Sequence, residues 1–390
     1  MAAEKAAPTV SECLATWIEG LRPDDIPEAA RHEAENTIID TIGLSVAALE
    51  TDYGQAVRKA FDQRGDCTVF GLDGGFESAA AAVINGTCGH GEDYDNTYEG
   101  CPVHSGVAIV PALFAAGESL KLPAREVAKG VVVGIEIACR LGLVAQKGVH
   151  SAGFHPTAIL GCMGAAAGVA AAMGQSRAQI RDTLGVAGSM ASGIIEYLAD
   201  GTWTKRLHPG WAAQSGYKAA LLARTGFFAP RTVFEGAHSF FKAFAPTATP
   251  DFSHLTQGLG RDWYMQRVVF KPYACGTMIH PYIDCTIRLA QQGVRGDDIV
   301  SIVCETGEGL VHRLWEPLAA KHEPPSGYAA KFSMPYCMAV GFYEGDAGLA
   351  QFSDEKARDP RILALARKVS YVIDPDNEYP RNYSGHIRVT

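Results

Sequence analysis

The sequence predicts a mostly α-helical protein, with a large all-helical domain over residues 1–258 and a smaller α+β domain over residues 259–390. Three observations support this prediction. A chain of 390 residues is long enough for two domains. In the first half, one segment after another carries apolar residues at helical spacing. After Arg261, short runs rich in β-branched residues become frequent, which is typical of strands.

The helices of the first domain follow from apolar periodicity and from the residues at their ends. Apolar residues repeat at helical spacing over 10–21, and Pro27 suits the first turn of a second helix that continues to Val46. Residues 158–174 are mostly Ala and Gly, which is too weakly hydrophobic for a membrane span and predicts a buried helix. Further helices are expected over 78–88, 106–119, 124–144, 157–173, 177–190 and 212–224, with one extended segment at 67–70.

The second domain is predicted to mix strands and helices. We expect strands over 266–270, 299–305, 369–372 and 386–390, and helices over 279–292 and 331–343. The sequence stops inside the last of these strands. Because a hairpin needs a second arm, we expect this strand to lack a partner and the natural chain to continue beyond Thr390.

Composition limits the partners and the cellular location. The net charge of −9 argues against nucleic acid as a partner, although a few cations in one pocket would still bind a small anion. The ten cysteines show no CxxC spacing, which argues against a zinc ribbon or a thioredoxin-like motif. The first residues lack the apolar core of a signal peptide, so we expect a cytoplasmic protein with free thiols and no membrane association.

The densest group of polar residues lies at 90–97, with sequence HGEDYDNT, and His104 follows shortly after it. Such residues are costly to bury without a purpose. Three interpretations remain open: a metal site built on His90, Glu92, Asp93 and Asp95, a general acid–base site without a metal, and a solvated loop with helix-capping aspartates.

Two further histidines stand next to turn residues, His155 before Pro156 and His208 before Pro209. Each is expected to precede a helix, whose N-terminus suits a carboxylate ligand. Lys205 and Arg206 lie close to His208 in the sequence and favour an anion-binding site. The alternative is that both histidines cap or pack and that the two cations lie at the surface.

Lys271, Cys275 and His280 lie where the character of the sequence changes. A lysine after a strand, followed by a glycine-containing turn into a helix, is consistent with an anion pocket or with an ordinary strand end. Cys275 is a weak candidate for a nucleophile, because no Cys-His-Asn spacing accompanies it. The sequence contains neither a GxGxxG motif between a strand and a helix nor a GxxxxGK[ST] motif, so nucleotide binding has no local support.

Taken together, these segments resemble the MmgE/PrpD family. The matching stretches run in the order expected for the family: GHGEDYDNTYEGCPVHSGVAIVPALFAAGE, GIEIACRLG, GFHPTAILGCMGAAAG, TKRLHPGWAAQSGYKAALLARTG, KPYACGTMIHPYID and KFSMPYCMAV. Members include 2-methylcitrate dehydratases, cis-aconitate decarboxylases and iminodisuccinate epimerases. The resemblance implies a large helical domain, a smaller lid domain, an active site between them, a homodimer, and neither cofactor nor metal.

The resemblance also implies roles for single residues. Its substrates are small polycarboxylates whose reactions form or consume a carbanion-like centre, which calls for cations and a positioned proton donor. We expect His104 to transfer the proton and Asp93 to orient it. Lys205, Lys271 and His155 are expected to bind carboxylates, together with Arg206, His208 and His280. Thr97 and Tyr336 are expected to donate hydrogen bonds, and Tyr336 to be able to deliver a proton.

Two features depart from the pattern of the family. Gly276 stands where animal decarboxylases have a histidine, and His280 follows one helical turn later, whereas the KPYAC run is more similar to the fungal decarboxylases. The C-terminal segment that completes the lid in relatives is missing after Thr390. We therefore expect a cofactor-independent lyase, first of the 2-methylcitrate dehydratase type. A cis-aconitate decarboxylase, an iminodisuccinate epimerase, a metal-dependent hydrolase and a non-catalytic carboxylate-binding protein are the alternatives.

Overall fold

The computed structural model describes residues 7–200, 202–379 and 381–390 and divides the chain into two compact units. The first unit contains the chain up to Gly91 and the segment Asp95–Phe270. The second unit contains Lys271–Thr390 together with the three residues Glu92–Tyr94. The division therefore falls later than residue 258, and a short segment from the first half of the chain belongs to the second unit.

The first unit is built from helices around an apolar core. Its helices are α1 (Val10–Gly20), α2 (Glu28–Ala47), α3 (Asp52–Ala60), α4 (Ser78–Gly91), α5 (Gly106–Leu120), α6 (Ala124–Ala145), α7 (Gly148–Ser151), α8 (Pro156–Ala172), α9 (Arg177–Met190), α10 (Tyr197–Asp200), α11 (Thr204–Arg224), α12 (Phe240–Phe244) and α13 (Ser253–Thr256). The first helix begins with a capping box, in which the Thr9 side chain accepts a hydrogen bond from the backbone N–H of Glu12.

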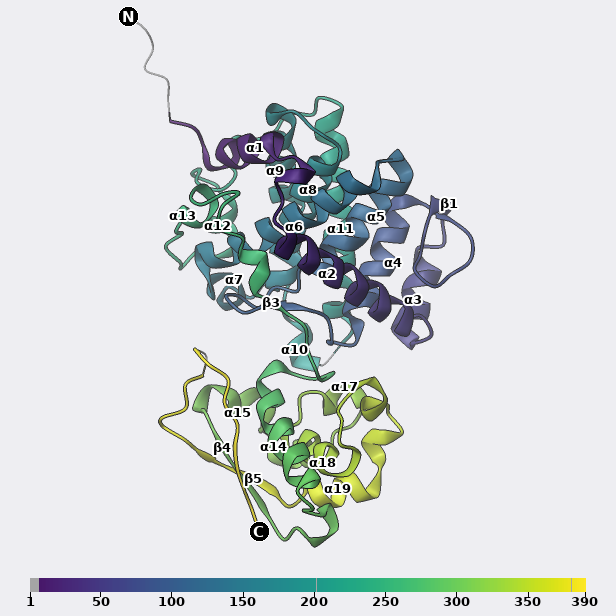
Figure 1. Ribbon diagram of the computed structural model, residues 1–390, viewed down its shortest axis with the longest axis vertical. Coiled ribbons are helices and arrows are strands. Elements are labelled where there is room, and N and C mark those ends of the chain that lie inside the picture. Colours follow the sequence, from purple (N-terminus) through teal and green to yellow (C-terminus); the bar gives the residue numbers. More distant parts are fainter. Residues whose placement is uncertain (1–6, 201, 380) are drawn as a thin grey trace, which may run out of the picture. The chain divides into compact units, whose positions relative to one another are not determined.

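Helix α8 lies at the centre of this unit, where it packs against α6, α9 and α11 (Figure 1). Every residue of α8 is buried, as the sequence predicts for the Ala/Gly stretch. Glycines allow the close approach to α6: a Cβ at Gly164 would lie 2.7 Å from the carbonyl oxygen of Gly134. The two glycines therefore serve close helix packing.

The sequence predicts an all-helical first domain with one extended segment at 67–70. The first unit is mainly helical, but it also contains short strands. Strand β2 (Thr97–Tyr98) pairs antiparallel with β3 (Val268–Val269), and β1 (Arg64–Cys67) forms isolated bridges with Phe76. The predicted strand at 266–270 thus belongs to this unit rather than to the second. Residues Tyr264–Arg267 form a 3₁₀-helix immediately before it.

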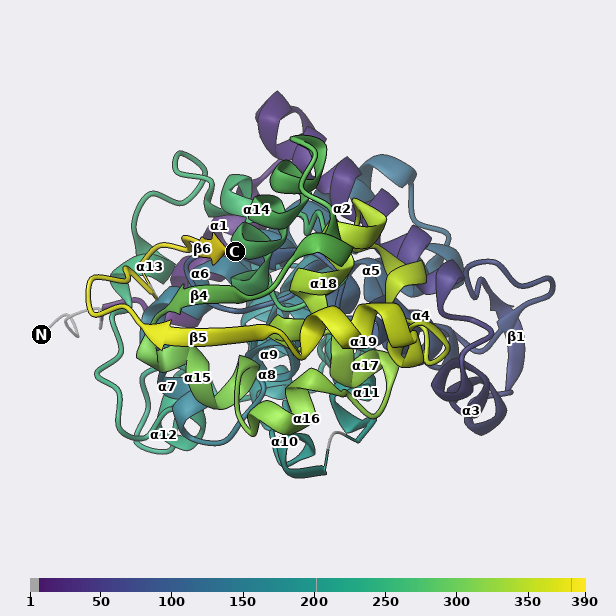
Figure 2. The same ribbon diagram turned by 90° about the horizontal axis from the view of Figure 1, so that it is seen from below.

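The second unit has a three-stranded mixed sheet and the α+β character that the sequence predicts. Strand β4 (Ile302–Thr306) lies between β5 (Val369–Ile373), which is parallel to it, and β6 (His386–Val389), which is antiparallel (Figure 2). The helices are α14 (His280–Gln291), α15 (Glu308–Leu314), α16 (Leu318–His322), α17 (Gly327–Ala330), α18 (Met334–Glu344) and α19 (Pro360–Ala366).

The predicted fold class, mostly helical with a smaller α+β part, is confirmed. The expectation that the last strand lacks a partner is wrong. Ile302 of β4 has Val389 of β6 as its antiparallel partner, because the last strand pairs with a strand much earlier in the sequence rather than with a following arm. Within the described residues, we find no helix with the length and hydropathy needed to cross a bilayer.

Candidate active site

In the first unit, one carboxylate lies against two imidazoles. Helix α4 is buried along almost its whole length and places His90 in its last turn. The chain returns to this unit at Asp95, whose Oδ2 lies 2.9 Å from Nδ1 of His90 and 3.3 Å from Nδ1 of His104. The Asp95 side chain and the His90 side chain are fully enclosed, and His104 is 8% exposed.

The neighbouring Asn96 fixes the orientation of the His104 ring. Nδ1 of His104 lies 2.9 Å from the backbone oxygen of Asn96, which can only accept a hydrogen bond. Asn96 is itself held by α2, since its backbone N–H donates to Asp40 and its side-chain amide donates to Thr37. Because Nδ1 of His104 is the donor, the lone pair of the neutral ring lies on Nε2.

A second pair of imidazoles lies beside the first. Nδ1 of His155, at the N-cap of α8, is 3.1 Å from Nδ1 of His208 on α11. The rings of His90 and His155 stack with their centroids 5.5 Å apart, and Tyr197 packs edge-on against both His155 and His208. One of two facing Nδ1 atoms must donate and the other accept, so the two neutral rings have opposite tautomers.

Helix α11 begins at Thr204, eight residues earlier than predicted. Lys205, Arg206 and His208 therefore lie within its first two turns instead of in a turn before it. The Arg206 guanidinium lies 4.2 Å from the centre of the Tyr53 ring, and Lys205 is half-buried. Thr97 is buried in β2, where Val269 is its partner across the strand pair.

Burial keeps most of these imidazoles neutral. Desolvation lowers the pKa of His90 and of His208 to about 4, and the positive charge of Lys205 adds to the effect. Desolvation also lowers the pKa of His155 well below its usual value, together with the charges of His90 and Lys205. For Asp95, burial raises the pKa, but the charges and hydrogen bonds of His104 and His90 outweigh it and hold this pKa well below its usual range. At neutral pH, the His155–His208 pair therefore presents one outward N–H donor to a carboxylate, on the ring whose Nδ1 accepts, whereas Lys205 offers positive charge.

The second unit holds a separate group of charged residues around the segment Glu92–Tyr94. Nζ of Lys271 donates to the backbone oxygen of Asp93 at 2.6 Å and lies 3.4 Å from its carboxylate. Nζ of Lys331 makes the same two contacts with Glu92, at 2.6 Å and 2.8 Å. Asp93 has a left-handed backbone conformation, with φ of 52°, which aspartate tolerates better than most residues.

Two carboxylates of this segment have partners in different units. Within the first unit, the Asp95 carboxylate contacts His104, whereas in the second unit the Asp93 carboxylate lies beside Lys271. Lys271, expected to bind a substrate carboxylate, makes an ion pair with Asp93 in this structure. A substrate carboxylate at Lys271 would therefore compete with, or add to, an existing charged contact.

Three other predicted residues lie in the core of the second unit. Nε2 of His280 lies 3.3 Å from the backbone oxygen of Cys275. The Cys275 thiol is fully buried; burial raises its pKa, but hydrogen bonds with Cys337 and His280 outweigh this and lower the pKa to about 6. Tyr336 is fully buried as well, and its hydroxyl donates to the backbone oxygen of Gln351. The Tyr336 hydroxyl is thus engaged by the protein itself.

The same contacts bear on the metal-site interpretation. Among the described residues, His90, Asp95 and His104 bring possible ligand atoms within 4.8 Å of one another. Nδ1 of His104 donates its proton to the Asn96 oxygen, so Nε2 is the nitrogen of this ring that carries a lone pair. Glu92 and Asp93, the other two residues of the sequence-based hypothesis, make ion pairs with lysines in the second unit.

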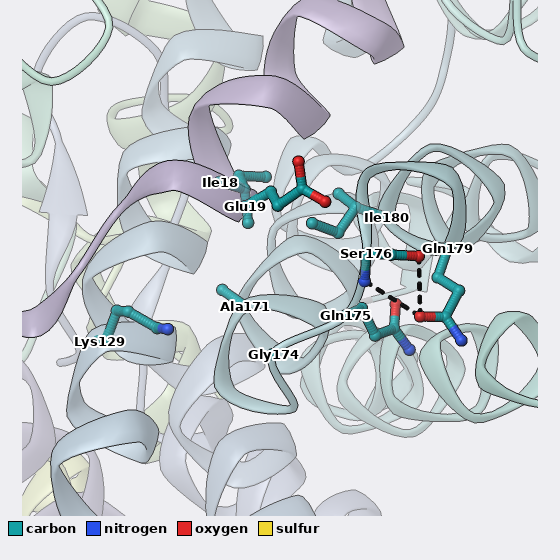
Figure 3. Close-up of a pocket in the computed structure, with 9 residues that line it drawn as sticks. All are labelled: Ile18, Glu19, Lys129, Ala171, Gly174, Gln175, Ser176, Gln179 and Ile180. Carbon is teal, nitrogen blue, oxygen red and sulfur yellow. Dashed lines mark hydrogen bonds between the residues drawn. The ribbon is translucent and has the colours of Figure 1, made fainter.

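A cavity of about 380 Å³ lies elsewhere in the first unit, between α1, α6 and the start of α9 (Figure 3). It contains none of the residues predicted to form the site. Its polar groups are already paired: Ser176 and Gln179 form a capping box, and Lys129 makes an ion pair with Glu126 at 2.8 Å.

Sequence reasoning named His90 and Asp95 only as possible metal ligands, and it did not select Lys331. The first two lie in the polar group at 90–97, where the presence of four ionisable residues in six was the available signal. The sequence could not show which carboxylate pairs with which partner, because this depends on the turn at Asp93. Lys331 carries no signal in the sequence, since its partner Glu92 lies more than 200 residues earlier.

Comparisons with known proteins identify the family to which this chain is similar. The model of the MmgE/PrpD N-terminal domain matches residues 12–253, and that of the MmgE/PrpD C-terminal domain matches residues 273–390. The chain is 27% identical to a cis-aconitate decarboxylase of Aspergillus terreus over 91% of its own length and 76% of the relative. It is 26% identical to the human cis-aconitate decarboxylase over 95% of its length and 78% of that protein. A cis-aconitate decarboxylase-like protein of Aspergillus oryzae is 26% identical over 95% of the chain and 81% of its own length.

Proposed function

Because the chain belongs to the MmgE/PrpD family, we propose that it is a cofactor-independent carbon–carbon lyase that decarboxylates a small polycarboxylate of the cis-aconitate type. The observation that carries the proposal is the buried group of His90, Asp95 and His104, with Lys205 close by. The relatives named above are cis-aconitate decarboxylases, so the comparisons favour decarboxylation over the dehydration of 2-methylcitrate expected first from the sequence.

The residues of the first unit match the needs of such a reaction. Cleavage of the bond to a carboxyl group releases CO2 and leaves an electron pair on carbon. Lys205 would neutralise a remaining carboxylate, and the outward N–H of the His155–His208 pair would bind another. His104, protonated on Nε2, would donate its proton to the carbon and regain one from water. Each turnover then consumes one proton and releases one CO2.

The roles that we propose for residues of the second unit rest on the family resemblance alone. Lys271 and Tyr336 match positions of the lid in the resemblance, and Asp93 and Thr97 match residues of its first active-site segment. His280 lies one helical turn after the position at which animal decarboxylases have a histidine. Their contact with substrate stays a prediction. The same holds for the homodimer and for Arg206 as a carboxylate ligand.

A substrate panel with NMR detection tests the proposed function. Cis-aconitate, 2-methylcitrate, citrate and iminodisuccinate would each be incubated with the protein in deuterated water. We expect cis-aconitate alone to lose a carboxyl group, with release of CO2 and incorporation of one deuteron into the product. His104→Ala should reduce this turnover by about 10²-fold or more, the usual contribution of a positioned proton donor.

The control for this experiment is His32→Ala, which removes an imidazole from the exposed face of α2 and should leave turnover unchanged. Dehydration of 2-methylcitrate without any decarboxylation of cis-aconitate would contradict the proposal. So would full turnover of cis-aconitate by His104→Ala.

A further inference from the structure

One oxygen atom of Asp95 contacts two imidazoles. The sequence suggests this residue only as a possible metal ligand, and the comparisons assign it no role. We propose that Asp95 is a positioning residue for proton transfer, which holds His90 and His104 in the Nδ1–H tautomer and supplies the counter-charge for a protonated His104. The role of His104 as proton donor is taken from the proposed function, whereas the tautomers and the counter-charge follow from the geometry of the structure.

The tautomers follow from what each Nδ1 atom faces. Nδ1 of His90 lies 2.9 Å from the Asp95 carboxylate, which is ionised and can only accept. Nδ1 of His104 faces the same carboxylate oxygen at 3.3 Å and the Asn96 carbonyl at 2.9 Å. Both Nδ1 atoms must therefore donate, and both Nε2 atoms carry the lone pair when the rings are neutral.

The counter-charge follows from burial. A carboxylate with no exposed surface loses the stabilisation of water and needs positive charge nearby. With both imidazoles neutral, the group His90–Asp95–His104 carries one negative charge, and uptake of one proton makes it neutral. A protonated imidazole beside this carboxylate therefore has a compensating charge, whereas a second proton would leave the buried group with a net positive charge.

The surroundings direct that proton to His104. The other ionisable groups around this site are His155 at the N-cap of α8, Lys205 and His208 on α11, and Asp40 on α2. His90 is the more deeply enclosed of the two imidazoles, whereas part of the His104 surface reaches solvent. Protonation of His104 therefore costs less desolvation than protonation of His90.

His90 has a supporting part in this arrangement. It binds the same Asp95 oxygen that faces His104, and the His90 ring is stacked against His155 at 5.5 Å and lies 5.0 Å from the His104 ring. These contacts keep the carboxylate from rotating away. This is the logic by which a carboxylate fixes the tautomer of a reacting imidazole and stabilises its protonated form.

Nitrogen-15 NMR of the imidazole rings tests the tautomers in the wild-type protein without substrate. Uniformly ¹⁵N-labelled full-length chain would be recorded above pH 8, with His90→Asn and His104→Ala spectra used to assign the two rings. We expect both rings to carry hydrogen on Nδ1. Hydrogen on Nε2 of the neutral His104 ring would overturn the proposal, and this result does not depend on which substrate the enzyme uses.

Kinetics of two variants then test the counter-charge. Asp95→Asn keeps the shape of the side chain and removes its charge, so kcat should fall by about 10²-fold or more while KM changes little. Without the carboxylate, His104 holds its proton less well, and the alkaline limb of the kcat profile should move to lower pH. His90→Asn keeps an N–H donor near the position of Nδ1, so its loss of kcat should be smaller than that of Asp95→Asn.

Asp66→Asn is the matched control, because this carboxylate is exposed on β1 and its removal should leave both kcat and the pH profile unchanged. An unshifted pH profile in a folded Asp95→Asn protein would overturn the counter-charge role even if kcat fell. If Asp95→Asn does not fold, the tautomers of the wild-type rings and the kinetics of His90→Asn still decide the proposal. If cis-aconitate is not a substrate, the proposed function is refuted, but the tautomers of His90 and His104 found by NMR remain valid.

Discussion

At the scale of single residues, the ion pair between Lys271 and Asp93 is a buried contact whose loss should be costly. The exposed fractions of the two side chains are 3% and 5%, so neither charge is well hydrated. Lys331 and Glu92 form a similar pair in the same unit, with the lysine almost fully enclosed. Removing one partner of a buried pair leaves the other charge without compensation.

We expect Lys271→Met to lower the free energy of unfolding by about 3–5 kcal/mol, because Asp93 is left buried and charged. The double variant Lys271→Met/Asp93→Asn should regain most of this stability, since no isolated charge remains. Urea unfolding followed by circular dichroism would measure both. Equal destabilisation in the single and the double variant would show that the pair is not what stabilises this segment.

The two carboxylates Asp93 and Asp95 show where prediction from the sequence stopped. Residue types and spacing marked the segment as a candidate site. In the structure, His90 lies against both His104 and His155, and His155 lies against His208. The choice between Asp93 and Asp95 depended on a positive φ at one residue. No pattern in a single sequence reports such a dihedral angle, because aspartate also occurs at ordinary helix caps and turns.

At the scale of elements, helix ends were harder to predict than helices. The helix over 177–190 is observed with the predicted bounds, but α11 begins at Thr204 instead of near residue 212. Pro209 and Gly210 normally indicate a turn. Here Gly210 instead allows close packing against α4, since a Cβ at this position would lie 2.7 Å from Oγ1 of Thr87. Tertiary packing therefore outweighs the local preference of the two residues.

The contact between α6 and α8 should be sensitive to any added side-chain volume. A Cβ at Gly168 would lie 2.5 Å from the backbone oxygen of Gly130, which has no freedom to move away. We expect Gly168→Val to lower the free energy of unfolding by at least about 1–3 kcal/mol, the usual cost of overpacking. Thermal unfolding followed by circular dichroism would measure the loss.

Gly43→Ala provides the comparison for this element. Gly43 lies within α2, and an added Cβ there meets no atom within 4 Å. Alanine favours helix over glycine by about 1 kcal/mol, so this variant should be as stable as the wild type or more stable. A Gly168→Val protein with unchanged stability would contradict the packing described for α8.

At the scale of the whole molecule, the buried imidazoles link stability to pH. The pKa values of His90 and His208 are lowered to about 4 in the folded protein, against about 6.5 for an unfolded chain. A folded state that resists protonation is fully stabilised above the unfolded pKa and loses that stability as the pH falls towards the folded value. The depressed pKa of Asp95 acts in the same direction at still lower pH.

We therefore expect the midpoint of thermal unfolding to fall steadily between about pH 6.5 and pH 4, and to be nearly constant from pH 7 to 8. Differential scanning calorimetry across this range would measure the dependence. The slope should be smaller for His208→Asn, which removes one of the responsible groups, than for the wild type. A midpoint that rises on acidification would show that these imidazoles are not buried in the neutral form.

The facing nitrogens of His155 and His208 have one more consequence. Because the two atoms are chemically alike, a single proton hop between them, coupled to exchange of the outer protons, reverses the polarity of the pair while every heavy atom keeps its place. In one polarity the first ring presents an acceptor outward, and in the other it presents a donor. A rigid pocket with such a pair is able to bind an anion at one stage of a turnover and a hydroxyl group at another. Neutron diffraction would locate the hydrogen atoms and so distinguish the two tautomeric arrangements.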